Sequence, residues 1–432
     1  MTDALPIDRA VIGEHNAARA DALRRDCDHL DEQLARNGLD LGTVKARVAT
    51  LEIALPSWAV GTGGTRFARY PGPGEPRNVF EKFEDCAVVQ QLVRCTPRVS
   101  VHFPWDRTDD LRALREFATA CGLGFDAVNS NTFQDQPGQQ HSYKFGSLTH
   151  VSPATRAQAV AHNLEVIEAG RALGSHALTL WIGDGSNLPG QQDFHGAFER
   201  YLESARSIYA ALPDDWQLLI EHKLYEPALY STVIQDWGSS LLAANALGPR
   251  ARCLVDLGHH APSVNIEMIV ARLHAQGKLG GFHFNDSKYG DDDLDSGSIN
   301  PLQLFLIFNE LVAREIADAS WSRPAYMIDQ SHNMTDPIES LISSADHIAG
   351  SYARACLVDR AALAGYQADN DPLMAYQTLK RAYETDVRPL IAMLRIEAGG
   401  ATDPVAAYRQ SAYRKRKTAA RPQAATGTAG IV

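Results

Sequence analysis

Short runs of hydrophobic residues alternate with longer helix-like segments along most of the chain. The helical pattern is clear, for example, at residues 152–173 and 301–317. Strands buried on both faces are continuously apolar, and an alternation of strands with helices is typical of parallel pairing. Eight repeats of such a unit predict a closed (β/α)₈ TIM barrel. The predicted strands lie at residues 51–58, 99–105, 125–129, 177–183, 217–222, 252–257, 281–285 and 325–329.

The segments on either side of these runs are predicted to be helical. Residues 7–48 are rich in Ala, Arg, Leu, Asp and Glu, contain no proline, and predict one or two amphipathic helices. After Ser331 the helical pattern continues to Lys417 without a convincing strand. We therefore expect an N-terminal helical segment (1–48), a barrel domain (49–350), a C-terminal helical extension (351–417) and a disordered Ala/Gly/Thr-rich tail (418–432).

Composition and charge limit which binding partners and which cellular compartments are expected for the protein. The formal net charge of −11 disfavours binding to nucleic acid or to an anionic membrane. No apolar run approaches the ~18 residues that a membrane span needs, and the charged start is unlike a signal peptide. The six cysteines form no Cys-x-x-Cys pair, as expected for reduced thiols in the cytoplasm. The basic run 414–417 fits a solvated helix end better than a nucleic-acid patch.

Polar side chains gather where four consecutive predicted strands end. The carboxyl ends of barrel strands converge at one mouth, where barrel enzymes keep their active sites. Carboxylates crowded into one mouth repel one another, and divalent cations neutralise them. Carboxylates with a few imidazoles suit Mn²⁺, Mg²⁺ or Co²⁺, so the pattern predicts a metal site, although one such residue alone would fit a salt-bridged strand end. The four segments are Glu221-His222-Lys223, Asp256-Leu257-Gly258-His259-His260, His283-Phe284-Asn285-Asp286 and Asp329-Gln330-Ser331-His332.

The spacing within these segments favours two ions. Asp256 and His259 stand three residues apart at a strand end, so the aspartate can bridge while the histidine turns to a second ion. Asp291 and Asp293 alternate in an extended loop and would face the same side. An EF-hand is excluded in this loop, because its glycine position holds Ser296 and its final glutamate position holds a leucine.

The same segments carry a resemblance to a known family. Further matches are Pro56-Ser57-Trp58, the Gly-rich stretch 61–67, Val101-His102-Phe103-Pro104-Trp105 and the long segment 282–293. Together they resemble bacterial L-rhamnose isomerase, of the broad-specificity, pseudomonad-type branch of the xylose isomerase-like superfamily. The resemblance covers nearly the whole chain.

This resemblance implies a metal-dependent aldose–ketose isomerase, an intramolecular oxidoreductase of rhamnose metabolism. It would convert L-rhamnose to L-rhamnulose and act on related aldoses such as D-allose, as a cytoplasmic homotetramer. Two divalent ions per subunit are implied, with Mn²⁺ preferred and Co²⁺ or Mg²⁺ as alternatives. The implied ligands of the first ion are Glu221, Asp256, His283 and Asp329, and those of the second are His259, Asp291 and Asp293, with Asp256 shared.

Catalytic and substrate-binding residues follow from the same resemblance. His102 resembles the histidine that opens the sugar ring, and Lys223 the lysine that steadies charge at O1, with Asp329 completing the catalytic set. Loop 61–74, which carries Phe67, is implied to reach over a neighbouring subunit's site. An apolar wall against the sugar is implied for Trp58, Trp105, Phe133 and Trp181. Taken singly, His102 and the tryptophans would also fit a hydrophobic core.

The implied reaction opens the sugar ring and then passes a hydride from C2 to C1 with the help of the ions. An enediol route would also fit the residues. A ketose 3-epimerase of the same superfamily is the main alternative function, but it would need one ion and a pair of acid/base carboxylates, so the second ligand set counts against it. A multi-zinc barrel endonuclease is disfavoured by the acidic charge, and a non-catalytic sugar- or cation-binding barrel is another interpretation.

Overall fold

Eight parallel strands form a closed barrel in the computed structural model, which describes residues 6–61, 63, 70–226, 230–331 and 334–422. Around the barrel the order is β1-β11-β10-β9-β6-β4-β3-β2, so that the first and last strands close the ring. The predicted TIM barrel is thereby confirmed. The strands are β1 (Ala54–Pro56), β2 (Arg98–Phe103), β3 (Gly124–Ser130), β4 (Ala177–Leu180), β6 (Gln217–Glu221), β9 (Ala251–Asp256), β10 (Leu279–Phe284) and β11 (Ala325–Ile328).

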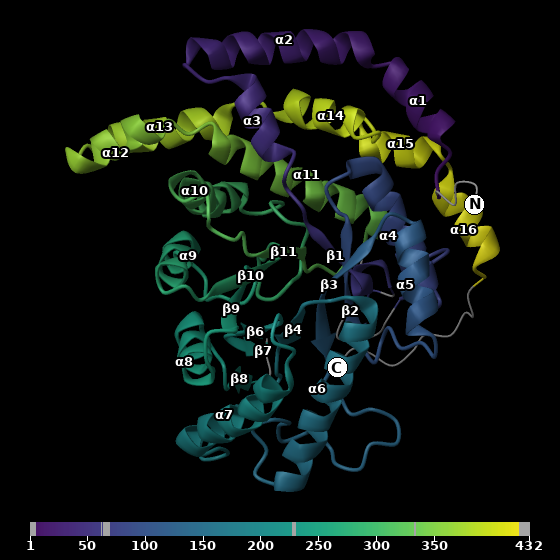
Figure 1. The fold of residues 1–432 in the computed structure, drawn as a ribbon, viewed down its shortest axis with the longest axis vertical. Coiled ribbons are helices and arrows are strands. Elements are labelled where there is room, and N and C mark those ends of the chain that lie inside the picture. The colour runs from purple at the N-terminus through teal and green to yellow at the C-terminus, as the bar shows by residue number, and fades with distance from the viewer. Residues whose placement is uncertain (1–5, 62, 64–69, 227–229, 332–333, 423–432) are drawn as a thin grey trace.

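A helix follows each barrel strand and packs on the outside of the ring (Figure 1). Several of these helices begin at an Asp or Asn whose side chain accepts a hydrogen bond from the first turn, as Asn78 does from the backbone N–H of Glu81. The helices are α4 (Val79–Val93), α5 (Leu111–Ala120), α6 (Pro153–Leu173), α7 (Phe194–Ala211), α8 (Trp237–Leu247), α9 (Ile266–Ala275), α10 (Pro301–Ala317) and α11 (Pro337–Cys356).

Two local features differ from the sequence-based expectation. The first predicted strand, 51–58, is shorter in the structure, because a 3₁₀ helix over Ser57–Val60 turns the chain at the barrel mouth. A small antiparallel sheet of order β5-β8-β7, formed by the loops after β4 and β6, was not expected. Its strands β5 (Gly185–Ser186), β7 (Tyr225–Glu226) and β8 (Tyr230–Thr232) are too short to produce a hydrophobic period.

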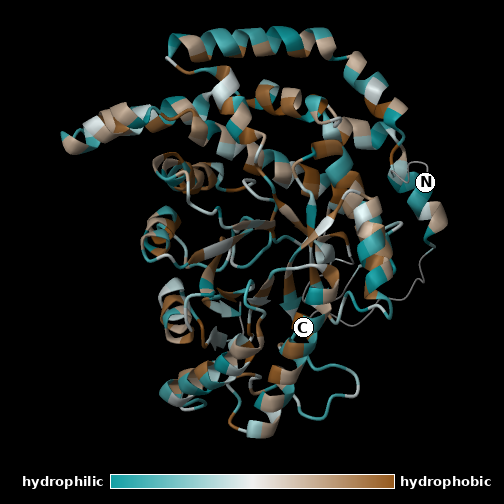
Figure 2. Cartoon of the chain, in the orientation of Figure 1, coloured by the Kyte–Doolittle hydropathy of each residue, from teal (hydrophilic) through white to brown (hydrophobic). Residues whose placement is uncertain are grey.

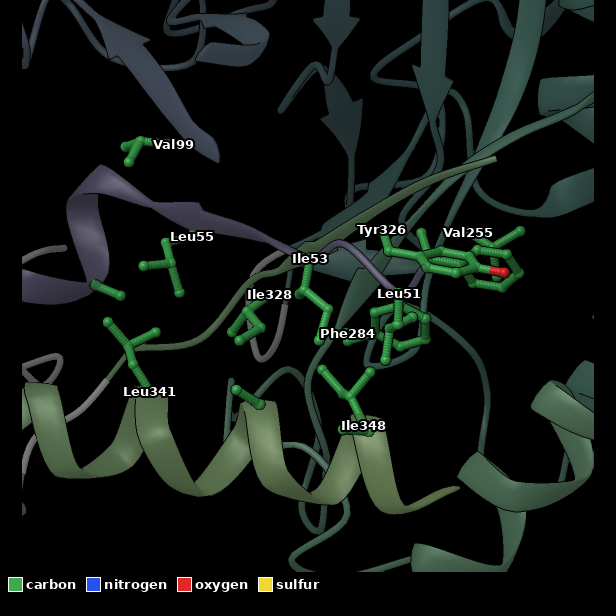
Figure 3. Close-up of a cluster of buried hydrophobic side chains, with 14 of the residues drawn as sticks. Leu51, Ile53, Leu55, Val99, Val255, Phe284, Tyr326, Ile328, Leu341 and Ile348 are labelled. Carbon is green, nitrogen blue, oxygen red and sulfur yellow. The ribbon is translucent and has the colours of Figure 1, made fainter. Parts of the chain in front are cut away.

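The hydrophobic core lies between the barrel and its helices. Figure 3 shows α11 presenting Leu341 and Ile348 toward Leu51, Ile53 and Ile328 beside the barrel wall. These five side chains are between 0 and 3% exposed. Burying each of them contributes roughly 1.5–3 kcal/mol, so this layer holds the closing strands β1 and β11 in place. Figure 2 shows the same division, with hydrophobic residues concentrated on the strands and the inward helix faces.

Helices from the two ends of the chain lie side by side on the outer side of α11, at the top of Figure 1. The Cys27 thiol of α2 donates to the carbonyl of Pro389 in the first turn of α14, and Lys45 of α3 pairs with Glu397 at the end of the same helix. None of the described helices combines the length and apolar character needed to span a membrane. These outer helices are α1 (Arg9–Ala17), α2 (Ala20–Arg36), α3 (Leu41–Val48), α12 (Arg360–Ala368), α13 (Pro372–Glu384), α14 (Arg388–Glu397), α15 (Pro404–Gln410) and α16 (Tyr413–Ala420).

The C-terminal basic segment is anchored to the barrel helices, which corrects two expectations. Helix α16 continues past Lys417, and Arg421 is only 2% exposed, 2.9 Å from the buried carboxylate of Asp85. Arg414 lies 2.7 Å from Asp336, and Lys417 pairs with Glu84. Disorder from residue 418 is therefore wrong for 418–421, and a solvated helix end is wrong for Arg414. The cause is a set of acids distant in sequence. Residues 423–432 lie outside the described part of the chain.

Candidate active site

Four predicted site residues meet at the carboxyl ends of neighbouring barrel strands. Glu221 ends β6, Asp256 ends β9, His283 lies near the end of β10, and Asp329 directly follows β11. One ligand atom from each lies within 4.8 Å of the others. The Nδ1 atom of His283 is 3.1 Å from Oε1 of Glu221 and 3.1 Å from Oδ2 of Asp329. These residue types at this separation could hold a metal ion.

A second group shares one carboxylate with the first. Asp256, His259 and Asp291 also offer ligand atoms within 4.8 Å of one another. The Nε2 atom of His259 lies 3.2 Å from Oδ1 of Asp291, while its Nδ1 lies 3.0 Å from the carbonyl oxygen of His222. An N–H donated to that carbonyl fixes the ring so that Nε2 faces the group. Asp256 is therefore placed between two potential ion positions.

Asp293 lies beside these two groups and is a member of neither among the described residues. Its carboxylate accepts a hydrogen bond of 3.0 Å from the Ser331 hydroxyl, and its φ of 48° is left-handed. Burial raises its pKa well above the usual range, and the nearby carboxylates of Asp291 and Asp329 add to the shift. A negative charge on Asp293 is thus disfavoured by these neighbours, and its role as a ligand stays a prediction.

A shell of hydrogen bonds orients the strand-end carboxylates. The amide of Asn285 donates to both oxygens of Asp256, at 3.0 and 3.1 Å, and the N–H of Gly258 donates to Oδ1 at 2.8 Å. The indole N–H of Trp58 donates to Oδ1 of Asp329 at 2.9 Å. The sequence analysis assigned no role to Asn285, although its place at the end of a predicted strand was a usable signal.

The electrostatics of the cluster fit a bound divalent cation. The pKa of Asp256 is raised to about 7, because burial and the charges of Glu221 and Asp329 outweigh the opposing histidines. Burial lowers the pKa of His283, but Glu221 and Asp329 outweigh this and leave it well above its usual value. The carboxylates thus draw positive charge onto the imidazoles, and a cation would supply that charge while the imidazoles ligate as neutral groups.

Lys223 lies at the edge of the second group and remains charged. Its Nζ is 2.6 Å from Oδ2 of Asp291 and 2.8 Å from Oε2 of Glu226, and it sits 5.3 Å from the ring centroid of Trp181. Burial lowers the pKa of Lys223, but Asp291 and Glu226 outweigh burial and raise it. Glu226 is a functional neighbour that the sequence did not reveal, because it reaches the site through the unexpected small sheet.

The predicted aromatic residues surround His102. The imidazole stacks on Trp105 at a centroid distance of 3.9 Å, and the edge-on rings of Trp58 and Phe133 lie 5.7 and 5.8 Å away. Trp181 extends this wall through its 4.5 Å contact with Phe133. Burial lowers the pKa of His102 to about 3, so the ring is neutral near pH 7. Phe67 and half of loop 61–74 lie outside the described residues.

Two curated relatives match the chain along its length. A probable sugar isomerase of Rhizobium meliloti (strain 1021) is 64% identical over 428 residues, which cover 99% of this chain and 100% of the relative. The chain belongs to this sugar isomerase family. A second probable sugar isomerase, from Mesorhizobium japonicum, is 60% identical and covers 99% of both chains. No model of a protein family matches the chain.

Among solved structures, the fold is similar to that of an L-ribulose 3-epimerase. The TM-score is 0.50 at 15% sequence identity, and the match covers 71% of this chain and 96% of that structure. At this identity the likeness concerns the barrel alone. The family assignment therefore rests on the two sugar isomerases, and it agrees with an isomerase whose acidic and histidine side chains could bind a metal.

Proposed function

We propose that this sugar isomerase interconverts aldoses and ketoses with two divalent metal ions, taking L-rhamnose to L-rhamnulose and accepting relatives such as D-allose. The observation that carries the proposal is the pair of ligand groups that share Asp256. One shared carboxylate would hold two cations near each other, and together they would polarise oxygens of one open-chain sugar. If the site held a single ion in the first group, His259 and Asp291 would have no role as ligands.

The ligand sets would divide between the two positions. Glu221, Asp256, His283 and Asp329 would hold the first ion, and Asp256, His259 and Asp291, joined by Asp293, would hold the second. When bound, the ions would polarise the carbonyl and hydroxyl oxygens of the sugar as Lewis acids. The mixed carboxylate and imidazole donors favour Mn²⁺, with Co²⁺ or Mg²⁺ as alternatives.

The side chains around the ions would handle ring opening and charge. His102 is neutral, and its Nδ1 is buried without a hydrogen-bond partner among the described residues, so the imidazole is suited to exchange a proton with the ring oxygen. Lys223 carries its charge beside Asp291, where it would stabilise negative charge on O1. Trp58, Trp105, Phe133 and Trp181 would form the apolar wall that keeps water from the open-chain sugar.

The hydrogen would pass directly between C2 and C1. Asp329 is engaged by the Trp58 indole and by His283, and Asp291 by Lys223 and His259. A carboxylate held by a cation or an N–H donor is a weak base. This distribution supports a hydride shift over an enediol formed by proton abstraction.

We further propose a cytoplasmic homotetramer in which loop 61–74 and its Phe67 cover a neighbouring site. Large apolar side chains stand exposed on the segments that follow barrel strands, two of them on loops and Phe194 at the start of α7. Phe145 is 65% exposed, Phe194 75% and Tyr289 88%. Contact with another copy of the chain would remove this apolar surface from water.

One experiment tests the proposal against its alternatives. The protein is stripped with EDTA, dialysed and reloaded with Mn²⁺, and ketose formation is assayed on L-rhamnose, L-mannose, L-lyxose, D-allose and D-xylose, with C3 inversion of ketoses measured in parallel. We expect metal-dependent ketose formation, lost in Glu221→Gln and retained in Glu315→Gln. The carboxylate of Glu315 is partly buried, lies on α10 and pairs with Arg323. C3 inversion without ketose formation from aldoses would favour the epimerase. Turnover in excess EDTA would contradict the proposed requirement for a metal ion.

A further inference from the structure

Asp106 is a buried carboxylate that joins three elements at the barrel mouth. Its side chain is fully buried and forms an ion pair of 2.6 Å with Lys82 of α4. The same carboxylate accepts a hydrogen bond from the hydroxyl of Ser57 and another, of 2.8 Å, from the backbone N–H of His102. The turn that follows β2 closes back on the strand through the Asp106 N–H, which donates to the His102 carbonyl at 2.9 Å.

The two residues that donate to Asp106, Ser57 and His102, both belong to the candidate site or adjoin it. Ser57 is next in sequence to Trp58, whose indole N–H donates to Asp329 in the first ligand group. His102 itself carries the imidazole proposed to open the sugar ring. One oxygen of Asp106, Oδ2, therefore holds the end of β1 against the end of β2. The Trp58 and His102 rings meet edge to face at 5.7 Å.

The His102 imidazole is not itself held at Nδ1. That atom is buried and has no hydrogen-bond partner in the part of the chain that the structure describes. Its orientation depends on the rings of Trp105, Trp58 and Phe133 and on the position of its own backbone. The backbone position is what Asp106 determines, since the two short hydrogen-bonded links span only residues 102–106.

Lys82 makes this arrangement stable and also acts on His102. A buried carboxylate without a cation is costly, and the ammonium of Lys82, whose side chain is 12% exposed, offsets that cost. Burial is the main cause that lowers the pKa of His102, and the positive charge of Lys82 is the second. The Lys82 ammonium thus lies close enough to act electrostatically on the imidazole.

We propose that Asp106 is a positioning residue of the active site, which sets the relation between Trp58 and His102 through their backbones. The inference rests on the proposed isomerase function, in which His102 opens the ring while the ions hold the open chain. Loss of the Asp106 acceptor would displace His102 and slow turnover, and the strand-end ligands, which lie on other strands, would keep their places.

A pair of charge-matched variants isolates this role. Lys82→Met with Asp106→Asn removes both charges and keeps an oxygen that accepts from the His102 N–H. Lys82→Met with Asp106→Leu removes the acceptor as well. We expect the Leu variant to lose about 10- to 100-fold in kcat/KM on the aldose that reacts best with wild type, because small misplacements of a catalytic group have effects of this size. The Asn variant should recover most of that loss.

Three further measurements separate positioning from general damage. Mn²⁺ content and the binding of the corresponding alditol, which has no ring to open, should be unchanged in both variants. A crystal structure of the Leu variant should show the 5.7 Å separation of the Trp58 and His102 rings altered by about 1 Å or more. The control is Asp85→Asn, which alters another fully buried carboxylate beside α16 and should leave these rings in place.

Two outcomes would overturn the inference. One is a Leu variant whose kcat/KM stays within about threefold of the Asp85→Asn control, a difference below 1 kcal/mol in the barrier. The other is a parallel loss of turnover, metal and alditol binding, which would assign Asp106 a purely structural role. If wild type turns over no aldose, the proposed function fails, and the ring separation in the crystal structure still decides whether Asp106 sets the position of His102.

Discussion

The indole N–H of Trp58 donates a hydrogen bond of 2.9 Å to Oδ1 of Asp329. This contact connects the aromatic wall, which would face the sugar, to the group of carboxylates that would hold an ion. It also leaves Oδ2 of Asp329 free to face His283 at 3.1 Å. A residue of the wall therefore orients a residue of the ligand group.

Replacing Trp58 with phenylalanine should weaken the first ion position. The variant keeps an aromatic ring and removes the N–H that orients Asp329. Loss of a hydrogen bond to a metal-ligating side chain costs about 10- to 100-fold in metal affinity or activity. We expect Mn²⁺ titration calorimetry to show at least the lower of these losses at one of two sites. Trp105→Phe is the control, because that indole stacks on His102 and, among the described residues, donates to no ligand carboxylate. Equal Mn²⁺ affinity in all three proteins would contradict the expectation.

Asp291→Asn should separate the two ion positions. The substitution removes a charge from the second group and leaves the first group, which does not include Asp291, intact. We expect elemental analysis after dialysis to find one tightly held Mn²⁺ per chain where the wild type holds two, with little remaining activity. Asp293→Asn should have the same effect if the carboxylate turns into the group on loading. Two equally tight ions in Asp291→Asn would show that the ligands are divided wrongly.

Isomerisation in D₂O should leave C1 of the ketose largely free of deuterium. A hydrogen that moves directly from C2 to C1 does not mix with solvent, whereas an enediol route exchanges it through a base. NMR of the ketose product measures how much deuterium is present at C1. Extensive deuterium at C1 would exclude the hydride shift and leave the metal site and the isomerase assignment standing.

The stability of the protein should depend on the protonation of His102. Burial lowers its folded-state pKa to about 3, below the unfolded value near 6.5. The unfolded state then binds more protons, so the contribution of His102 to stability is complete above pH 6.5 and is lost as pH falls toward 3. We expect urea unfolding in EDTA to show that wild type loses about 1–3 kcal/mol more than His102→Asn between pH 7 and pH 4. A pH-independent difference between the two proteins would contradict a buried neutral imidazole.

The barrel and the strand-end groups were predictable because their signals are local. A buried strand is recognised in the sequence by a continuous apolar run. The barrel geometry brings the residues at the carboxyl end of the strand to the mouth, as for Glu221 and Asp329. Contacts between distant segments leave no such signal. Asp106 looks like an ordinary turn residue, and Glu226 reaches Lys223 only through a sheet of very short strands. Arg421 lies in a composition typical of disorder, yet acids of α4 bury it.

The link between Arg421 and Asp85 has a consequence for how the chain is made. Asp85 belongs to the first helix that follows a barrel strand, and its side chain is fully buried in the finished protein. Its partner Arg421 leaves the ribosome 336 residues later, the difference between positions 421 and 85. Until then α4 carries a carboxylate that lacks this partner. In the same way, β1 has no partner on one side until β11 has been translated. The barrel can therefore close only after its last strand has been translated.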